Sequence, residues 1–198
     1  MAQWPSGQGN ALPRALVLGA TGHIGAHIVR ALLAEGVSVR AAYHTPRHLS
    51  VLDGLPVERI QVDVERPDGL RAAMEGSEWV FYAAGYYPRH YARRTQAVAR
   101  GVDAVRRVMR QAQAARLARV VYTSSAATIR QVPGRLANES DVEPWPLLAW
   151  RPLYAAVKIA MEQEALRWVQ EGVPVVVVNP SLCIGEYDAH RFSGRAVL

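Results

Sequence analysis

A tyrosine and the only lysine of the chain stand four residues apart, at Tyr154 and Lys158. On a helix this spacing places a phenol and an ammonium on one face. The positive charge favours the phenolate, which makes the tyrosine usable as a general acid or base at the oxygen of an alcohol or a carbonyl group. The alternative is an incidental pair on a helix surface. However, 22 of the 23 basic residues are arginine, and the one lysine falls at the position that this chemistry needs.

A hydroxyl that can serve the same substrate oxygen is supplied by Ser125, which follows an apolar, strand-like segment at 119–123. Such a hydroxyl can bond the oxygen and stabilise the charge that develops there. We therefore expect a catalytic set of Ser125, Tyr154 and Lys158, and Lys158 can also bond a ribose hydroxyl of a cofactor.

Three glycines follow the first apolar segment of the chain, in the spacing G-x-x-G-x-x-G rather than the commoner G-x-G-x-x-G. One glycine allows a tight turn, one lets the backbone approach a pyrophosphate, and one lets a helix pack on a strand. The N-terminus of the following helix adds free N–H groups and a positive dipole end. A tight turn without a ligand is the alternative, but the place between a strand and an amphipathic helix favours dinucleotide binding. The residues expected to contact the cofactor here are Gly19, Thr21, Gly22, His23, Ile24 and Gly25.

The segment around the end of the second expected strand carries no carboxylate between Glu35 and Asp53. Sites specific for NAD place an acidic residue there, whereas cationic donors stabilise the 2′-phosphate of NADP. Arg40, His44 and Arg47 supply such donors, so NADP is favoured over NAD. The alternative is a basic, solvent-exposed loop in an arginine-rich chain.

Asp63 and Val64 end the third expected strand, where the amino group of an adenine can be met. Asp63 is equally suited to be a simple turn residue.

Apolar runs of strand length alternate with helical patterns over most of the chain. The expected strands are 15–19, 37–43, 59–64, 79–84, 119–123 and 174–179, and the expected helices are one ended by Gly36, a short one after Pro67, 92–116 and 153–170. This alternation predicts an α/β fold with a doubly wound parallel sheet, Rossmann-like, covered on both faces. Ligands of such folds bind at the carboxyl ends of the strands, where the residues named above fall.

The glycine pattern, Ser125, the Tyr154/Lys158 pair and Asn179-Pro180-Ser181 together resemble the extended short-chain dehydrogenase/reductase family, also called the NAD-dependent epimerase/dehydratase family. The resemblance extends from about residue 14 to 198 and is nearest to nucleoside-diphosphate-sugar epimerases and dihydroflavonol-reductase-like enzymes. It implies hydride transfer between the nicotinamide C4 atom and a secondary alcohol or ketone carbon, in a nucleotide sugar or a small ketone. It also implies that Tyr154 is the acid/base, that Lys158 tunes its acidity and binds ribose, and that Ser125 holds the oxygen.

The resemblance adds further cofactor contacts. The segment 82–88 is similar to the part of that family that passes under the cofactor. The additional residues expected to contact the cofactor are Ala83, Ala84, Gly85, Asn179, Pro180 and Ser181.

Three departures from the family pattern matter. Val98 stands where the family often has an asparagine, and Ala126 and Ala127 replace the acidic pair of the sugar dehydratases. Family members also usually continue into a small substrate domain, which we expect to be missing here. The expected organisation is a loose lead-in at 1–13, a dinucleotide-binding domain at 14–182 and the start of a truncated substrate region at 183–198.

Epimerase and reductase activities are not separated by these features, because the basic loop favours NADPH and reduction while the family resemblance favours an epimerase. A hypothesis of a different class is a non-catalytic module that senses NADP(H) and regulates a partner. The expected truncation supports this module, and the intact Ser125, Tyr154 and Lys158 oppose it.

Composition excludes a disordered chain or a fibre, because 50% of the residues are hydrophobic and 20% are charged. The single cysteine, Cys183, excludes an internal disulfide and a cysteine-based zinc cluster, and no metal site is expected. No apolar run approaches ~18 residues and the first ten residues lack a signal-peptide pattern, so we expect a cytoplasmic protein without a membrane span.

The stretch from Arg89 to Arg119 contains nine arginines and one acid, Asp103. Such a helix can touch nucleic acid, but the solvated face of a packed helix is the favoured interpretation, so nucleic acid is an unlikely partner. In the family this helix often contributes to a dimer interface, which makes a homodimer a further expectation. Apolar residues at 145–153 either wall a substrate pocket or belong to the core under a loop.

Overall fold

The computed structural model describes residues 13–88, 92–142 and 150–188. Their centre is a six-stranded parallel sheet with the order β3-β2-β1-β4-β5-β6. The strands are β1 Arg14–Leu18, β2 Ser38–Tyr43, β3 Glu58–Gln61, β4 Trp79–Tyr82, β5 Arg119–Thr123 and β6 Val175–Val178. The helices are α1 His23–Ala34, α2 Pro67–Met74, α3 Arg94–Ala114 and α4 Leu153–Gln170, with short 3₁₀ turns η1 Pro46–Leu52 and η2 Ala126–Thr128.

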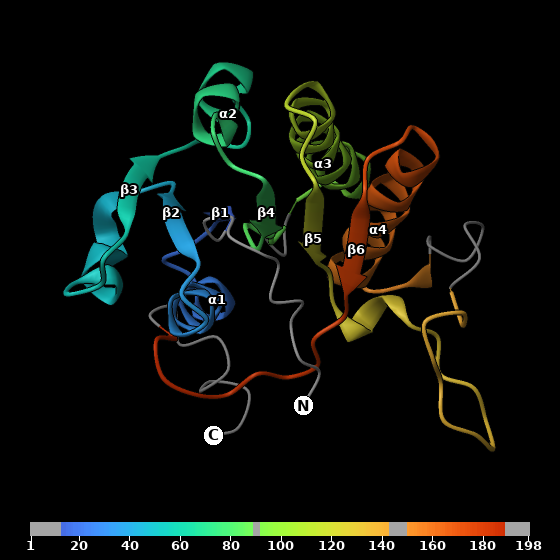
Figure 1. Ribbon diagram of the computed structural model, residues 1–198. Helices are drawn as coiled ribbons and strands as arrows, with labels where there is room; N and C mark the ends of the chain where they lie inside the picture. Colours follow the sequence, from blue (N-terminus) through green and yellow to red (C-terminus); the bar gives the residue numbers. More distant parts are fainter. Residues whose placement is uncertain (1–12, 89–91, 143–149, 189–198) are drawn as a thin grey trace.

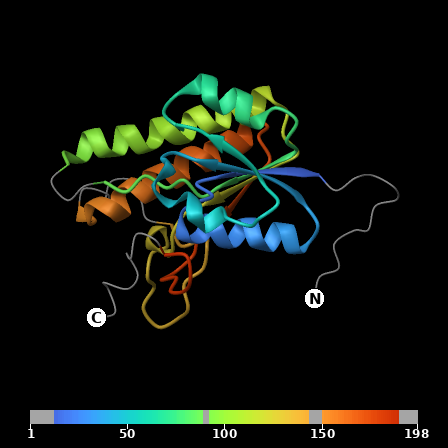
Figure 2. The same ribbon diagram turned by 90° about the vertical axis from the view of Figure 1, so that its left-hand side faces the viewer.

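The sheet is covered on both faces, as the apolar strands predict. The helices α2, α3 and α4 lie on one face, and α1 and η1 lie on the other (Figures 1 and 2). The alternating residues Leu16 and Val17 of β1 belong to the two different cores on these faces. The doubly wound, Rossmann-like fold expected from the sequence is therefore confirmed.

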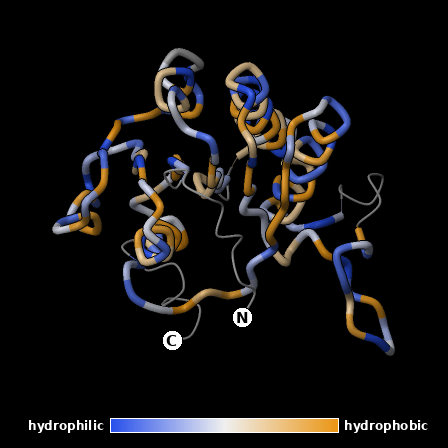
Figure 3. The backbone as a smooth tube through the Cα atoms, in the orientation of Figure 1, coloured by the Kyte–Doolittle hydropathy of each residue, from blue (hydrophilic) through white to orange (hydrophobic). Residues whose placement is uncertain are grey.

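β6 is a continuous hydrophobic segment at one edge of the sheet (Figure 3). Its residues Val175 and Val177 pack against the core shared with α3 and α4. Val176 and Val178 alternate with them and remain 41% and 40% exposed on the part of the chain that the structure describes. The coverage of the sheet therefore thins out toward β6 on the α1 side.

The boundaries differ from the expected ones where turns begin. β3 ends at Gln61 rather than at residue 64, because Asp63 opens a turn that bonds the N–H groups of Glu65 and Arg66. α3 ends at Ala114 rather than at residue 116, because Arg116 adopts a positive φ of 51° and Leu117 N closes onto Ala112 O. The two 3₁₀ turns were not expected from the sequence.

Several sequence-based expectations concern residues outside the described ranges. They include most of the lead-in at 1–13, the apolar loop residues before 150 and the end of the expected substrate region after residue 188. Among the described residues, none of the helices combines the length and the apolarity that crossing a membrane requires.

Candidate active site

The glycine loop, residues 19–25, doubles back tightly between β1 and α1. Gly19 has a positive φ of 84°, and a Cβ there would lie 2.8 Å from Ala84 N. A Cβ on Gly25 would overlap Gly19 O, so only glycine lets α1 start this close to β1. Gly22 N donates to Gly19 O at 3.0 Å and holds the turn. The loop after β4 thus passes directly against the end of β1.

α1 begins without a capping side chain. Its N-cap is Gly22, which forms no side-chain hydrogen bond, and its first residue is His23. The N–H groups of the first helical turn have no partner within a helix. Backbone N–H groups and a positive dipole end therefore face the loop, which is the arrangement that binds a pyrophosphate.

The expected acid/base pair occupies the first two turns of α4. Lys158 is 2% exposed, and burial lowers the pKa of its ammonium from 10.5 to about 8, while the carboxylate of Glu162 acts in the opposite direction. Its Nζ lies 5.9 Å from the ring centroid of Tyr154. The structure thus brings a buried cation next to the phenol.

Tyr87, which the sequence analysis did not single out, completes this cluster. Its ring stacks on that of Tyr154, with centroids 5.5 Å apart and planes inclined by 18°. Lys158 Nζ lies 5.2 Å from the Tyr87 centroid. The pKa of Tyr87 is raised to about 12 by burial, by Tyr154 and by a hydrogen bond with it. Only its place in the loop after β4 could have indicated this contact.

The loop after β4 passes against Lys158. A Cβ on Gly85 would lie 2.8 Å from Lys158 Nζ, so glycine leaves the space that the ammonium needs. Ala83 N donates to Leu18 O at 2.9 Å, which anchors the loop at the end of β1. The loop therefore joins the glycine loop to the Tyr154/Lys158 pair, and the three expected residues Ala83, Ala84 and Gly85 all lie on this path.

Ser125 lies directly after β5 and is half-buried. Its Oγ accepts a hydrogen bond from Ala127 N at 3.2 Å, which leaves its O–H available to donate to a substrate oxygen. Its carbonyl oxygen accepts from Thr128 N at 3.0 Å, and Thr128 Oγ1 lies 2.8 Å from it. The serine therefore stands at the start of a well-anchored turn.

The structure contradicts the expectation for Arg40. Its side chain is buried and its Nη1 donates to Ala73 O at 2.6 Å and to Glu75 O at 2.7 Å, while its Nε pairs with Glu58 at 3.0 Å. Arg40 pairs with Leu16 in the middle of the sheet, not at its carboxyl edge. Its guanidinium joins β2 to the end of α2 and cannot reach a cofactor phosphate.

The other residues expected near the adenosine follow the carboxyl ends of β2 and β3. His44 and Arg47 are exposed, and His44 Nε2 lies 3.9 Å from Asp63 Oδ2. Asp63 also accepts from Glu65 N at 2.9 Å, so it is a turn residue in addition to any contact with adenine. Val64 is half-buried and packs against the core.

The side chain of Asn179 points inward. Its Nδ2 lies 2.7 Å from Glu162 Oε2, 2.9 Å from Thr128 Oγ1 and 3.3 Å from Ser125 O. Pro180 O accepts from Ala126 N at 2.9 Å, and Ser181 is exposed. The Asn179 amide nitrogen is therefore used within the protein. The cofactor contact expected of Asn179, Pro180 and Ser181 stays a prediction.

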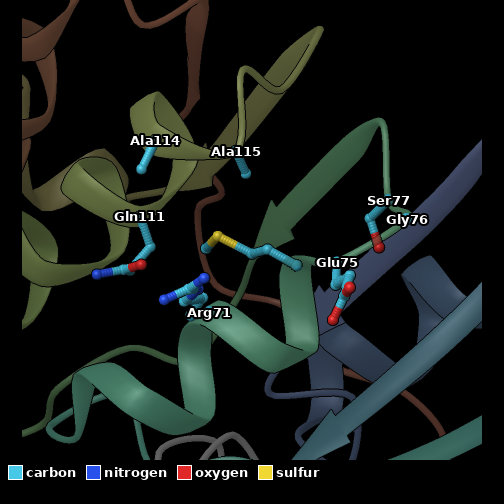
Figure 4. A pocket seen from close by; sticks show the side chains of 8 residues that line it. Arg71, Glu75, Gly76, Ser77, Gln111, Ala114 and Ala115 are labelled. Atoms are coloured by element: carbon cyan, nitrogen blue, oxygen red, sulfur yellow. The ribbon is translucent and has the colours of Figure 1, made fainter.

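A hollow at the amino ends of the strands is separate from this site. It is lined by residues from the ends of α2 and α3 and the turn before β4, namely Arg71, Met74, Glu75, Gly76, Ser77, Gln111, Ala114 and Ala115 (Figure 4). These elements meet at the amino end of β4, whereas the glycine loop and Lys158 lie at the carboxyl ends of the strands.

Several arginines of α3 pair with acidic residues. Arg100 Nε lies 2.6 Å from Glu65, and Arg106 lies 2.9 Å from Asp103 and 3.0 Å from Glu164. These contacts neutralise part of the positive charge of the arginine-rich stretch from Arg89 to Arg119.

Comparisons with known proteins show the family of this chain. The model of the NAD dependent epimerase/dehydratase family matches residues 15–198, so the chain belongs to this family. The chain is 34% identical over 186 residues to sterol demethylase protein B of Methylococcus capsulatus, covering 92% of this chain and 56% of that protein. It is 36% identical over 173 residues to a putative dihydroflavonol 4-reductase of Synechocystis, covering 87% and 50% respectively.

Among solved structures, a nucleoside-diphosphate-sugar epimerase from Pseudomonas aeruginosa superposes with a TM-score of 0.80. The identity is 24%, and the match covers 93% of this chain and 57% of the epimerase. This likeness shows the shared fold. The chain spans about half the length of the curated relatives it matches.

Proposed function

We propose that this chain binds a nicotinamide dinucleotide, preferably NADPH, and takes part in the reduction of a ketone to a secondary alcohol. The observation that carries the proposal is the buried ammonium of Lys158, which lies beside the Tyr154 phenol and against Gly85. A continuous backbone path leads from there to the glycine loop. The N-terminus of α1 would hold the phosphates of such a dinucleotide, and Lys158 and Tyr154 would lie at its nicotinamide end.

When bound, the cofactor supplies a hydride at the nicotinamide C4 atom. Tyr154 would donate its phenolic proton to the carbonyl oxygen of the substrate, which, together with the hydride that the cofactor would supply to the carbonyl carbon, completes a secondary alcohol. The ammonium of Lys158 stabilises the phenolate that remains. Ser125 donates a hydrogen bond to the same oxygen and limits the cost of the charge that develops there.

The preference for NADPH rests on the exposed His44 and Arg47 at the end of β2. Arg40 does not contribute to this preference, because its guanidinium is paired with other groups inside the protein. Titration of the chain with NADPH and with NADH, followed by nicotinamide fluorescence, tests the preference. Tighter binding of NADH would assign these basic residues to the surface and would favour an epimerase that retains NAD.

The Tyr154→Phe variant tests the chemistry. We expect turnover of a ketone with NADPH to fall by about 10²- to 10⁴-fold, because the proton donor is lost. NADPH binding stays within about two-fold of the wild type, since the ring and Lys158 remain. The control is Tyr187→Phe, which removes a phenol outside this cluster. Unchanged turnover in Tyr154→Phe would refute the role of Tyr154 as acid/base.

A further inference from the structure

Glu162 is a buried carboxylate to which the proposed reaction assigns no role. It lies on α4 one turn beyond Lys158 and is 8% exposed. Its Oε2 accepts hydrogen bonds from Ser124 Oγ, from Thr128 Oγ1 at 2.8 Å and from Asn179 Nδ2 at 2.7 Å. An ionised carboxylate only accepts hydrogen bonds, and this oxygen has three potential donors around it.

The three donors surround Ser125 from different elements. Ser124 precedes it at the end of β5, Thr128 ends the η2 turn that follows, and Asn179 comes directly after β6. Thr128 Oγ1 and Asn179 Nδ2 also contact Ser125 O, at 2.8 and 3.3 Å. Glu162 therefore joins α4, which carries Tyr154, to the turn that carries Ser125. This carboxylate is a polar link between these two groups, in addition to the packing of α4 on the η2 turn.

The same carboxylate acts on Lys158. Burial lowers the pKa of Lys158, and the negative charge of Glu162 raises it. The other titratable groups that face this region are the phenols of Tyr87 and Tyr154, while Tyr122 on β5 interacts electrostatically with Glu162 and Tyr154. Burial raises the pKa of Tyr87 and Tyr122, so these two phenols supply no negative charge near pH 7, and the carboxylate of Glu162 acts as the compensating charge for the buried ammonium.

We propose that Glu162 is a positioning residue of this site, which fixes the Ser125 turn against α4 and keeps Lys158 positively charged. Its effect on turnover rests on the proposed function, whereas its effect on the Lys158 charge and on the turn is a property of the chain alone.

The titration of Lys158 tests the charge directly. Because Lys158 is the only lysine, biosynthetic labelling with ¹³C-lysine gives a single ¹³Cε resonance to follow against pH. We expect Glu162→Gln, which keeps the shape but loses the charge, to shift the midpoint down by about one pH unit. The matched control is Glu164→Gln, because Glu164 lies on the same helix, is 7% exposed and pairs instead with Arg106, Arg167 and Trp168. This control leaves the midpoint unchanged. A folded Glu162→Gln variant with the wild-type midpoint would overturn the proposal.

Turnover separates positioning from simple stability. We expect Glu162→Gln to lower kcat at least ten-fold, to leave the KM for NADPH unchanged and to move the alkaline limb of the pH–rate profile to lower pH. Glu164→Gln lowers the melting temperature but leaves the profile in place. An unmoved profile in Glu162→Gln would mean that Glu162 only stabilises the fold.

A second variant covers the case in which Glu162→Gln does not fold. Ser124→Ala removes one donor and keeps the charge, so we expect a lower kcat with an unchanged Lys158 midpoint. Wild-type kcat in Ser124→Ala would overturn the positioning of Ser125. Absence of any turnover in the wild type would refute the proposed function, and the lysine titration would still decide the role of Glu162.

Discussion

At the scale of single residues, the site depends on one charged group held out of water. Lys158 is buried among the rings of Tyr87 and Tyr154 and the backbone of Gly85. Burial of an ammonium costs free energy unless a neighbouring charge compensates it. This unfavourable burial occurs where the proposed chemistry needs a cation. Buried ionisable groups with a shifted pKa are typical of functional sites.

The cost makes stability depend on pH. The unfolded chain keeps the Lys158 proton up to about 10.5, whereas the folded chain loses it near 8. Between these values the unfolded state binds more protons, so the contribution of Lys158 to the free energy of unfolding rises with pH, by up to roughly 3 kcal/mol. Urea unfolding of the wild type and Lys158→Met between pH 7 and 10 measures this effect.

We expect Lys158→Met to be more stable than the wild type at pH 7. The difference in their free energies of unfolding should become smaller as the pH approaches 10. Burial raises the pKa of Tyr82 and Tyr122, so these residues make the stability of both proteins fall at high pH. The difference in stability between the two proteins removes this shared effect. A gap that does not change with pH would contradict the lowered pKa of Lys158.

The two arginines near β2 should respond differently to substitution. Arg40→Met removes two hydrogen bonds and an ion pair, so we expect a loss of about 2–4 kcal/mol of stability with an unchanged ratio of NADPH to NADH affinity. Arg47→Ala should leave stability nearly unchanged and reduce that ratio about ten-fold. Thermal melts and paired cofactor titrations measure both effects. A changed cofactor ratio in a folded Arg40→Met variant would mean that Arg40 does act on the cofactor phosphate.

At the scale of elements, close packing of α3 on α4 holds in place the helix that carries Tyr154 and Lys158. Gly101 on α3 faces α4, and a Cβ there would lie 2.9 Å from Met161 Sδ and 3.1 Å from Val157 Cγ1. Glu164 on α4 adds hydrogen bonds from Arg106 and from Trp168 Nε1. The position of Lys158 therefore depends on a glycine in a neighbouring helix.

Substitution of this glycine should destabilise the protein. We expect Gly101→Val to cost about 2–4 kcal/mol, because Val157 cannot move away without separating the helices. The control is Gly69→Ala on α2, where a Cβ meets nothing within 4 Å and better helix propensity should add up to about 1 kcal/mol. Denaturant unfolding compares the two variants. Equal stabilities would mean that the α3–α4 contact is looser than the structure shows.

At the scale of the whole molecule, the carboxyl edge of the sheet gathers the groups that a dinucleotide needs. The loops after β1, β2, β4, β5 and β6 all reach this edge because the strands are parallel. Apolar side chains remain exposed beyond β6, with Leu182 and Ile184 exposed by 61% and 63%.

Cofactor binding should raise the free energy of unfolding of the whole chain. At NADPH concentrations about 100 times the Kd, we expect a gain of about 2.7 kcal/mol and a rise in melting temperature of about 5–10 °C. NADH at the same concentration should give a smaller rise. A melting temperature that neither cofactor changes would mean that these residues do not form a complete binding site.

The local parts of the site could be predicted from the sequence. The glycine loop and the Tyr154/Lys158 pair depend on short spacings within one turn or one helix, and such spacings fix which atoms share a face. The alternation of strands and helices likewise determined the doubly wound fold, because apolar strands of this kind must be covered on both faces.

Only the tertiary structure decided how distant side chains are used. The position of Arg40 in the sequence favours a phosphate contact, but its long side chain reaches the carbonyl oxygens at the end of α2. Glu162 and Asn179 meet although 17 residues separate them, and Tyr87 reaches Tyr154 from a different loop. Such contacts are determined by how whole elements pack together, and this packing does not appear as a periodic pattern of residues in the sequence.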